Sequence, residues 1–284
     1  MSSIEQAFVQ SLLEDQKRVS GRRLNEARKL ELAFGGSYGH VEVKMGRTRL
    51  VAQVSSQVAK PRDDRPFEGL FLITTDVSSM ASPRFENGRQ TVDELMVTRL
   101  IEKAIRRSNA LDLESLCIVA GQSCWMVRAD VHYLEYDGGF IDASCIAVIA
   151  ALLHFRRPDT SIDGSRTIVH TLDERPPVPL SVLHVPICVS WSFFDNDIIV
   201  VDADEAEQDL RIGSMTITIN KDRDICQFTK AGKIPLSSQQ IIECCEQAHG
   251  RAREITDLIH EKLKQDFEKR NRGNMGFDLA ENDR

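Results

Sequence analysis

The chain has 284 residues, of which 42% are hydrophobic and 28% are charged, a balance typical of folded globular proteins and not of disordered or collagen-like chains. No run approaches the roughly 18 consecutive apolar residues of a membrane-spanning helix, and the first residues lack the features of a secretory signal. We therefore expect an intracellular protein with no membrane partner. With 36 basic and 43 acidic residues the net charge is −7, so nucleic acid would have to bind at a local basic patch.

Cysteine spacing argues against a metal or disulfide framework. The number of cysteines is odd, no CxxC pair occurs, and their surroundings are apolar. We expect reduced thiols that pack as small hydrophobic side chains, and no zinc site. The seven cysteines are at positions 117, 124, 145, 188, 226, 244 and 245.

The first part of the chain begins with a helix and continues with strands. Apolar residues at helical spacing predict a helix over 4–18. Alternating apolar residues then predict a hairpin of strands 41–45 and 50–58 around the turn Gly46-Arg47. A charged loop with two prolines, 60–66, and a strand near 70–73 follow.

A second stretch combines two helices with two strands. Thr91 stands three residues before Glu94, the spacing of a capping box, and an apolar stripe follows, which predicts a helix over 91–108. Strands are expected near 116–119 and over 125–133. After Asp137-Gly-Gly139, residues 141–155 are apolar on nearly every side, as in a buried helix.

The last third repeats the order of strands followed by a helix. Helical spacing predicts a long helix from Ser237 or Ser238 to about 268, after which the pattern is lost and a mobile tail is expected. The order predicts a mixed α/β fold of two pseudo-repeated halves. The expected strands lie near 182–194, 198–202, 215–219 and 225–230, and the expected units are an N-terminal helix 1–22, a first lobe 23–180, a second lobe 181–268 and a tail 269–284.

One face of the helix predicted over 91–108 is cationic. Arg99, Lys103 and Arg106 recur at helical spacing, and Arg107 is adjacent to them. The four cations could hold successive phosphates of a nucleic-acid strand. The alternative is a solvated face whose cations suit the negative end of the helix.

The turn Asp137-Gly-Gly139 precedes a helix and could hold an anion at the free N–H groups. However, Phe140 and Ile141 offer no side-chain donor, and Asp142 places a carboxylate in the first helical turn. A structural turn is the favoured interpretation.

Residues 202–209 contain five carboxylates, which could hold magnesium or could form a solvated acidic loop. The sequence contains no HExxH, GxSxG, P-loop or GxGxxG motif. From the residues alone we therefore predict no cofactor, and both interpretations of residues 202–209 stay open.

Longer strings at these segments are more specific than the single motifs. They are Lys44-Met-Gly-Arg-Thr48, Asp63-Asp-Arg-Pro-Phe-Glu-Gly-Leu70, Ala110-Leu-Asp-Leu-Glu-Ser-Leu-Cys-Ile118, Trp125-Met-Val-Arg-Ala-Asp130, Asp137-Gly-Gly-Phe-Ile-Asp-Ala-Ser144, Pro186-Ile-Cys188 and Ile199-Val-Val-Asp202. By these strings the chain resembles the ribonuclease PH-like family, in particular the ring subunits of the eukaryotic RNA exosome. The similarity extends over about residues 15–265.

The resemblance implies two βαβ-rich lobes similar to the second domain of ribosomal protein S5, and six such subunits around an RNA channel. Active members use phosphate to attack the 3′-terminal phosphodiester of RNA and use carboxylates to place magnesium. This chain departs from that pattern. Phe140 and Ile141 stand where active members have Thr-Arg, and Asp93 stands where a second phosphate-binding arginine is expected. Of two metal-side aspartates, the first matches Asp202 and the second falls on Gln208.

The resemblance thus implies a non-catalytic ring subunit that helps form the channel for 3′-to-5′ RNA processing. It also implies single-stranded RNA, other ring subunits, cap subunits of the S1/KH type and an associated nuclease as partners, in the nucleus, the nucleolus and the cytoplasm. Cations on the central helix contact RNA in such subunits, which favours that role for Arg99, Lys103, Arg106 and Arg107. The alternatives are an active phosphate-dependent exoribonuclease and an unrelated α/β interaction domain.

Overall fold

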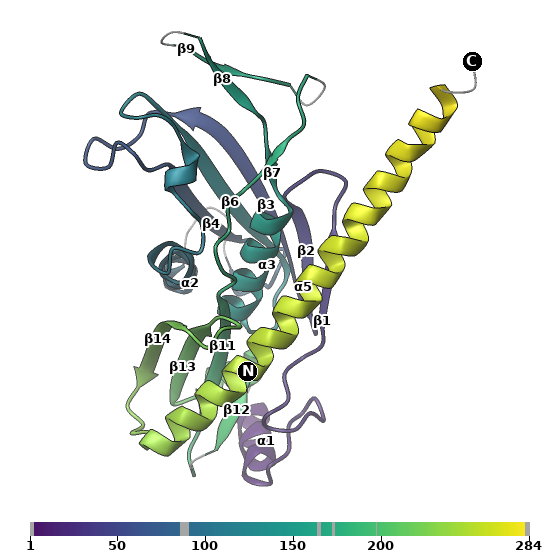
Figure 1. The fold of residues 1–284 in the computed structure, drawn as a ribbon. Helices are drawn as coiled ribbons and strands as arrows, with labels where there is room; N and C mark the ends of the chain where they lie inside the picture. Colours follow the sequence, from purple (N-terminus) through teal and green to yellow (C-terminus); the bar gives the residue numbers. More distant parts are fainter. Residues whose placement is uncertain (1–2, 86–90, 164–165, 172–173, 197, 282–284) are drawn as a thin grey trace.

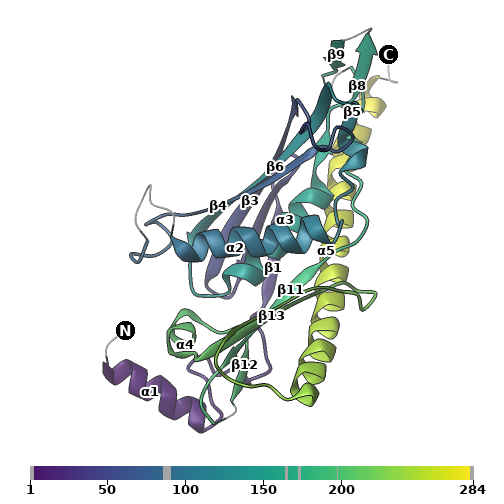
Figure 2. The same ribbon diagram turned by 90° about the vertical axis from the view of Figure 1, so that its left-hand side faces the viewer.

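The computed structural model describes residues 3–85, 91–163, 166–171, 174–196 and 198–281, and for residues 93, 163, 166 and 271–281 it describes the backbone alone. Two antiparallel-rich sheets stack with helices between them (Figures 1 and 2). The larger sheet has the order β1-β2-β3-β6-β4, with β5 paired to β6. Its strands are β1 (Leu30–Phe34), β2 (His40–Met45), β3 (Thr48–Ala59), β4 (Leu70–Val77), β5 (Cys117–Val119) and β6 (Ser123–Glu135).

Two helices cover the inner face of this sheet. The helix α2 (Val92–Glu102) starts at a capping box in which Thr91 accepts a hydrogen bond from the Glu94 N–H and the Glu94 carboxylate accepts one from Thr91. The same carboxylate accepts from the Val77 N–H at 3.2 Å, so the cap also ties α2 to β4. The second helix, α3 (Phe140–His154), follows the strand β6 after a short turn.

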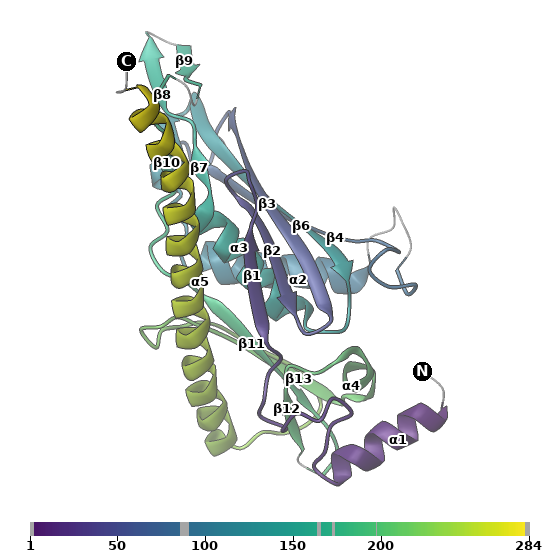
Figure 3. The ribbon, with the colours of Figure 1, turned by 90° about the vertical axis from the view of Figure 1, so that its right-hand side faces the viewer.

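The smaller sheet has the order β12-β11-β13-β14, with every neighbouring pair antiparallel. The helix α3 packs on one face of the sheet, and the long helix α5 (Ser238–Glu281) packs on the other (Figure 3). The strands are β11 (Ile187–Phe193), β12 (Ile199–Val201), β13 (Gly213–Ile219) and β14 (Ile225–Gly232), and a short helix α4 (Glu205–Leu210) follows β12.

The N-terminal helix α1 (Ser3–Glu14) belongs to the second lobe. Its side chains Val9 and Leu13 are buried against Phe194 and Val200 in a small separate core. Figure 2 shows α1 below the smaller sheet, far from the larger one.

The helix α3 is central to the whole molecule. Its residues are apolar all round because it contacts the larger sheet on one side and β11 on the other. One continuous hydrophobic core therefore extends from Val41 on β2, through Ile146 and Ile149 on α3, to Ile255 and Ile259 on α5. Within the described residues, no helix is both long enough and apolar enough to cross a membrane.

Most of the expected elements are present, which confirms the two-lobed α/β fold, but several boundaries and short elements differ. The α-helix expected over 91–108 ends at Glu102 and continues as a π-helical turn, η1 (Lys103–Arg107). Beyond this turn, the Ala110 N–H bonds to the Ile105 carbonyl, and Asn109 is left-handed with φ +54°.

Periodicity did not predict several short elements. These are β1, α4, the short helix η2 (Glu114–Leu116), and the strands β7 (Arg156–Arg157), β8 (Thr160–Asp163), β9 (Arg166–Val169) and β10 (Val178–Pro179).

The long helix was expected to end near 268, and the structure continues it to Glu281. No proline interrupts the chain there. Arg270 also fixes this part of the helix, because its guanidinium donates to Asp266 and to the carbonyls of Gly35 and Gly36 in the β1–β2 turn.

Candidate functional site

A cavity of about 290 Å³ lies between the lobes, where the first turn of α3 meets α2, α4 and the smaller sheet. It includes several of the residues that sequence analysis assigned to degenerate phosphate and metal sites. Its lining residues are Arg84, Met96, Val97, Leu100, Tyr136, Gly139, Phe140, Ile141, Ser190, Gln208, Asp209, Arg211, Ser214, Thr216, Thr229 and Ala231.

An aromatic cluster forms one wall of this cavity. The ring of Phe140 stacks on Tyr136 with centroids 4.1 Å apart and an interplanar angle of 20°. Phe85 meets both rings edge-on, and Tyr133 meets Phe140 edge-on at 4.9 Å. Aromatic pairs of this kind hold their geometry, and their ring faces offer no donor for an anion. The two tyrosine hydroxyls already donate within the protein, from Tyr136 to Gln208 and from Tyr133 to the Phe140 carbonyl. The start of α3 is thus packed with aromatic rings.

The turn before α3 is shaped by close packing. Gly138 and Gly139 both have positive φ, at +77° and +75°. A Cβ on Gly138 would lie 2.6 Å from the Ala203 carbonyl, and one on Gly139 would lie 2.5 Å from the guanidinium of Arg28. Only glycine fits at either position. These contacts support the structural-turn interpretation.

Asp142, in the first turn of α3, faces the smaller sheet. Its carboxylate accepts hydrogen bonds from the Ser190 N–H at 3.0 Å and from the Ser190 hydroxyl at 2.6 Å. Complete burial raises the pKa of Asp142 to about 7 against the opposing effect of these hydrogen bonds. This residue fastens α3 to β11.

The Asp202 carboxylate, which follows β12, is bound by Arg28 from the segment before β1. Arg28 donates to the Asp202 carboxylate from Nε at 2.9 Å, from Nη2 at 2.6 Å and from its backbone N–H at 2.8 Å. Only 3% of Asp202 is exposed, and its φ is +49°. Burial tends to raise the pKa of Asp202, but the hydrogen bonds and charge of Arg28 outweigh it and leave that pKa below the ordinary value.

Three more arginines pair with the other carboxylates of the acidic segment. Arg18 makes a bidentate pair with Glu207 at 2.9 and 2.6 Å, and Glu207 is 2% exposed. Arg22 pairs with Asp204 at 2.6 Å, and Arg84 pairs with Asp209 and lies near Glu205. The alternative of a solvated acidic loop over 202–209 is therefore wrong, because Asp202, Asp204 and Glu207 bind the segment 18–28 and most of the acidic segment forms the helix α4.

Gln208 is also engaged within the protein. Its side-chain amide donates to the Ala203 carbonyl at 3.1 Å, and its oxygen accepts from the Tyr136 hydroxyl at 3.2 Å. The next carboxylate, Asp209, pairs with Arg84 at 2.9 Å. In the part of the chain that the structure describes, no group of three or more His, Cys, Asp or Glu side chains is placed to hold a metal ion.

Comparisons with known proteins place this arrangement in a family. Residues 26–158 match domain 1, and residues 184–251 match domain 2, of the 3′ exoribonuclease family, also called ribonuclease PH. The chain belongs to this family.

Similar relatives include the exosome complex component RRP45 of Saccharomyces cerevisiae, 48% identical over 96% of this chain and 94% of the relative. The protein of the same name from Schizosaccharomyces pombe is 49% identical over 98% of this chain and 95% of the relative. A chain of the Archaeoglobus fulgidus exosome, solved with RNA bound to the active site, is 30% identical, with a TM-score of 0.77 over 89% of this chain and 97% of that chain. The resemblance seen in the sequence motifs is thus confirmed.

The cationic residues of α2 and η1 are not among the residues that line the cavity of this ribonuclease PH-like chain. Arg99, Lys103 and Arg107 are exposed, whereas Arg106 is half-buried and pairs with Glu102 at 3.1 Å. The residues of α2 that line the cavity are Met96, Val97 and Leu100. The π-helical turn changes the spacing on which one continuous face was expected. The side chain of Asp93 lies outside the described residues.

Sequence analysis missed the three arginines that organise the site, at positions 18, 22 and 28. They lie in a segment with little regular structure, so no periodicity marks them. Their partners are more than 170 residues away in the chain. The excess of carboxylates at 202–209 was the one available signal, because buried carboxylates need cationic partners.

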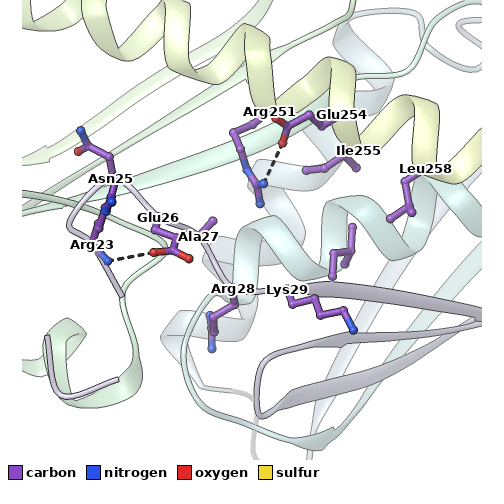
Figure 4. Close-up of a pocket in the computed structure, with 11 residues that line it drawn as sticks. Arg23, Asn25, Glu26, Ala27, Arg28, Lys29, Arg251, Glu254, Ile255 and Leu258 are labelled. Carbon is purple, nitrogen blue, oxygen red and sulfur yellow. Dashed lines mark hydrogen bonds and ion pairs between the residues drawn. The ribbon is translucent and has the colours of Figure 1, made fainter. Parts of the chain in front are cut away.

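A wider groove of about 970 Å³ runs beside Arg28, between residues 23–30 and α5 (Figure 4). Its charged groups bond to one another: Glu26 accepts from the Arg23 N–H at 3.1 Å, and Arg251 pairs with Glu254 at 3.0 Å. Ile255 and Leu258 form its apolar side.

Proposed function

We propose that this chain is a ring subunit of an RNA exosome that guides RNA without cleaving it. Its fungal relatives carry the name of exosome components, and a chain of an archaeal exosome shares its fold. The main observation in favour of a subunit that does not cleave RNA is that the guanidinium of Arg28 already binds the Asp202 carboxylate.

The first turn of α3, where the resemblance places phosphate binding, carries no cationic or hydroxyl side chain. Phe140 and Ile141 occupy the positions that the resemblance assigns to Thr-Arg, and the Phe140 ring is stacked on Tyr136. Arg84, which also lines the cavity, is already paired with Asp209. An attacking phosphate would have to displace these contacts without a free cation in the first turn of α3.

The metal side does not fit magnesium either. A hard cation needs oxygen ligands with free lone pairs. Asp202 already accepts two hydrogen bonds from the oppositely charged guanidinium of Arg28 and one from the Arg28 backbone N–H. The position of the second aspartate is Gln208, whose amide bonds to Ala203 and Tyr136. We therefore derive no metal-assisted step for this chain.

The RNA-guiding part rests on the exposed cations Arg99, Lys103 and Arg107, with Arg106 at their edge. Exposed cationic side chains can exchange their bound water for the phosphate oxygens of RNA, and the RNA then releases its bound counterions. Within the same proposal, the chain assembles with related ring subunits, S1/KH-type cap subunits and a separate nuclease. Its compartments are the nucleus, the nucleolus and the cytoplasm.

A phosphorolysis assay tests the enzymatic part. The purified chain, alone and in its reconstituted ring, is incubated with single-stranded RNA, phosphate and magnesium, and nucleoside diphosphates are measured. We expect none from this chain. Diphosphate release that requires phosphate and is lost in Asp202→Ala would support an active exoribonuclease instead.

A protection assay tests the RNA-guiding part. The ring is assembled with wild-type chain or with Arg99→Glu, Lys103→Glu and Arg107→Glu combined, and the length of RNA protected from an added nuclease is compared. We expect shorter or weaker protection with an intact ring. In the matched control, Glu replaces Arg62 and Arg128, two exposed cations outside α2 and η1. Equal protection by all three rings would refute an RNA-facing role of this helix.

A further inference from the structure

The strand β14 forms the edge of the smaller sheet. It pairs with β13 on one side over residues 225–232, and no other strand adjoins it (Figure 1). Because hydrogen-bonding groups alternate in direction along a strand, about half of its N–H and C=O groups point away from β13. Among the described residues, none of these backbone groups has a partner outside the ladder with β13.

Other sheet edges of the molecule are covered in part. On β12, the Val201 N–H donates to the Leu24 carbonyl at 3.0 Å. The helix α5 packs beside β1. At the two ends of β4, the Gly69 N–H bonds to Leu113 and the Val77 N–H bonds to Glu94. Among the described residues, β14 has no backbone hydrogen bond of this kind outside its ladder with β13, although the turn η1 lies close to it.

The sequence of β14 also lacks the usual protection of a solvent-exposed edge. Such edges normally carry prolines or several charges, which prevent pairing with other chains. β14 has no proline and a single charged residue, Lys230. Ile225 and Phe228 are 52% and 44% exposed, although both lie opposite buried isoleucines of β13.

We infer that β14 is an assembly edge, which pairs with an edge strand of a neighbouring ribonuclease PH-like subunit. Free backbone donors and acceptors in a row are matched by another strand and by no other secondary structure. The exposed apolar side chains then pack against the neighbour. The low charge of this edge disfavours RNA, whose phosphates need several cations.

This inference rests on the proposed function, since it names the surface through which the chain joins its ring. Hydrogen–deuterium exchange of the purified chain, compared with the assembled ring, tests it directly. We expect about half of the amides in peptide 225–232 to exchange rapidly in the isolated chain and to become protected in the ring. A ring that forms while this peptide stays unprotected would overturn the inference and leave the proposed function intact.

Variants provide a second readout. Ile225→Lys combined with Phe228→Lys adds charges to the edge without removing a fully buried side chain. We expect a folded chain that no longer enters the ring, measured by native mass spectrometry. The matched control is Ile162→Lys with Ile168→Lys, two comparably exposed residues of the β8–β9 hairpin. Unimpaired entry of the Ile225/Phe228 variant, or equal loss in the control, would contradict the role of β14. Failure of the wild-type chain to join related subunits would instead refute the proposed function.

Discussion

Arg28 and Asp202 form a buried ion pair that joins the segment before β1 to the second lobe. The guanidinium and the backbone N–H of Arg28 supply three hydrogen bonds to one carboxylate, and a further bond runs from Nη1 to the Asp137 carbonyl at 2.5 Å. The pair thus connects the segment before β1, the turn before α3 and the end of β12. It also occupies the carboxylate that the resemblance assigns to the metal side of an active site.

Replacing Arg28 by methionine removes one partner and leaves the Asp202 carboxylate buried. Breaking such a pair typically costs about 3–5 kcal/mol of unfolding free energy. Urea denaturation of Arg28→Met measures this cost. The control is Arg49→Met, which removes a more exposed pair with Glu42 and is expected to cost no more than about 1 kcal/mol. Equal costs for the two variants would contradict the buried role of Arg28.

The raised pKa of Asp142 predicts that the stability of the fold depends on pH. Its pKa is raised to about 7 in the folded chain, so between about pH 4 and pH 7 the folded state binds more protons at this group than the unfolded state. Its contribution to stability is present below about pH 4 and is lost as the pH rises through about 7. The stability of Asp142→Asn relative to wild type should therefore rise by up to about 1.4 kcal/mol per pH unit in that window. Denaturation at pH 4.5, 6 and 8 checks the trend, and a pH-independent difference would contradict it.

Restoring the motif of active relatives at one place should not restore activity. In Phe140→Thr with Ile141→Arg, Asp202 is still saturated by Arg28 and Gln208 is unchanged, so we expect no phosphate-dependent release of nucleoside diphosphates. Loss of the Phe140–Tyr136 stack should also lower stability by about 1–3 kcal/mol. Diphosphate release from this variant would show that the phosphate position alone had disabled the site.

Truncation of two isoleucines of α5 should have different effects on the free energy of unfolding. Ile259 is fully buried in the shared core, and truncation to alanine should cost about 2–5 kcal/mol. Ile242, on the same helix, is largely exposed, and its truncation should cost less than about 0.5 kcal/mol. Thermal and urea denaturation of the two variants give the comparison, and similar costs would mean that α5 is not held by its packed face.

Local patterns predicted those parts of the fold that depend on neighbouring residues. The hairpin around Gly46, the cap at Thr91 and the buried helix after Gly139 each have a signal within a few residues, and each is present. The helix α4 was missed because its six residues are too few to show periodicity. The π-helical turn at Lys103–Arg107 was missed because it depends on how the chain leaves α2 toward Ala110.

The structure brings part of the candidate site together, and the role of its residues stays a prediction. Phe140, Ile141 and Gln208 do line one cavity, although they come from separate segments. What fills the site instead of ligands, the aromatic stack and Arg28, depends on contacts between distant parts of the chain. Such contacts leave no periodic trace in the sequence.

The burial of α3 on all sides has a consequence for any attempt to divide this protein. The family matches stop at residue 158 and resume at 184, which suggests two separable halves. Yet α3 covers both sheets at once, so removing either half would expose one side of its apolar surface to water. Fragments cut in the connection between residues 158 and 184 should be insoluble when produced apart and should recover native structure only when they are refolded together.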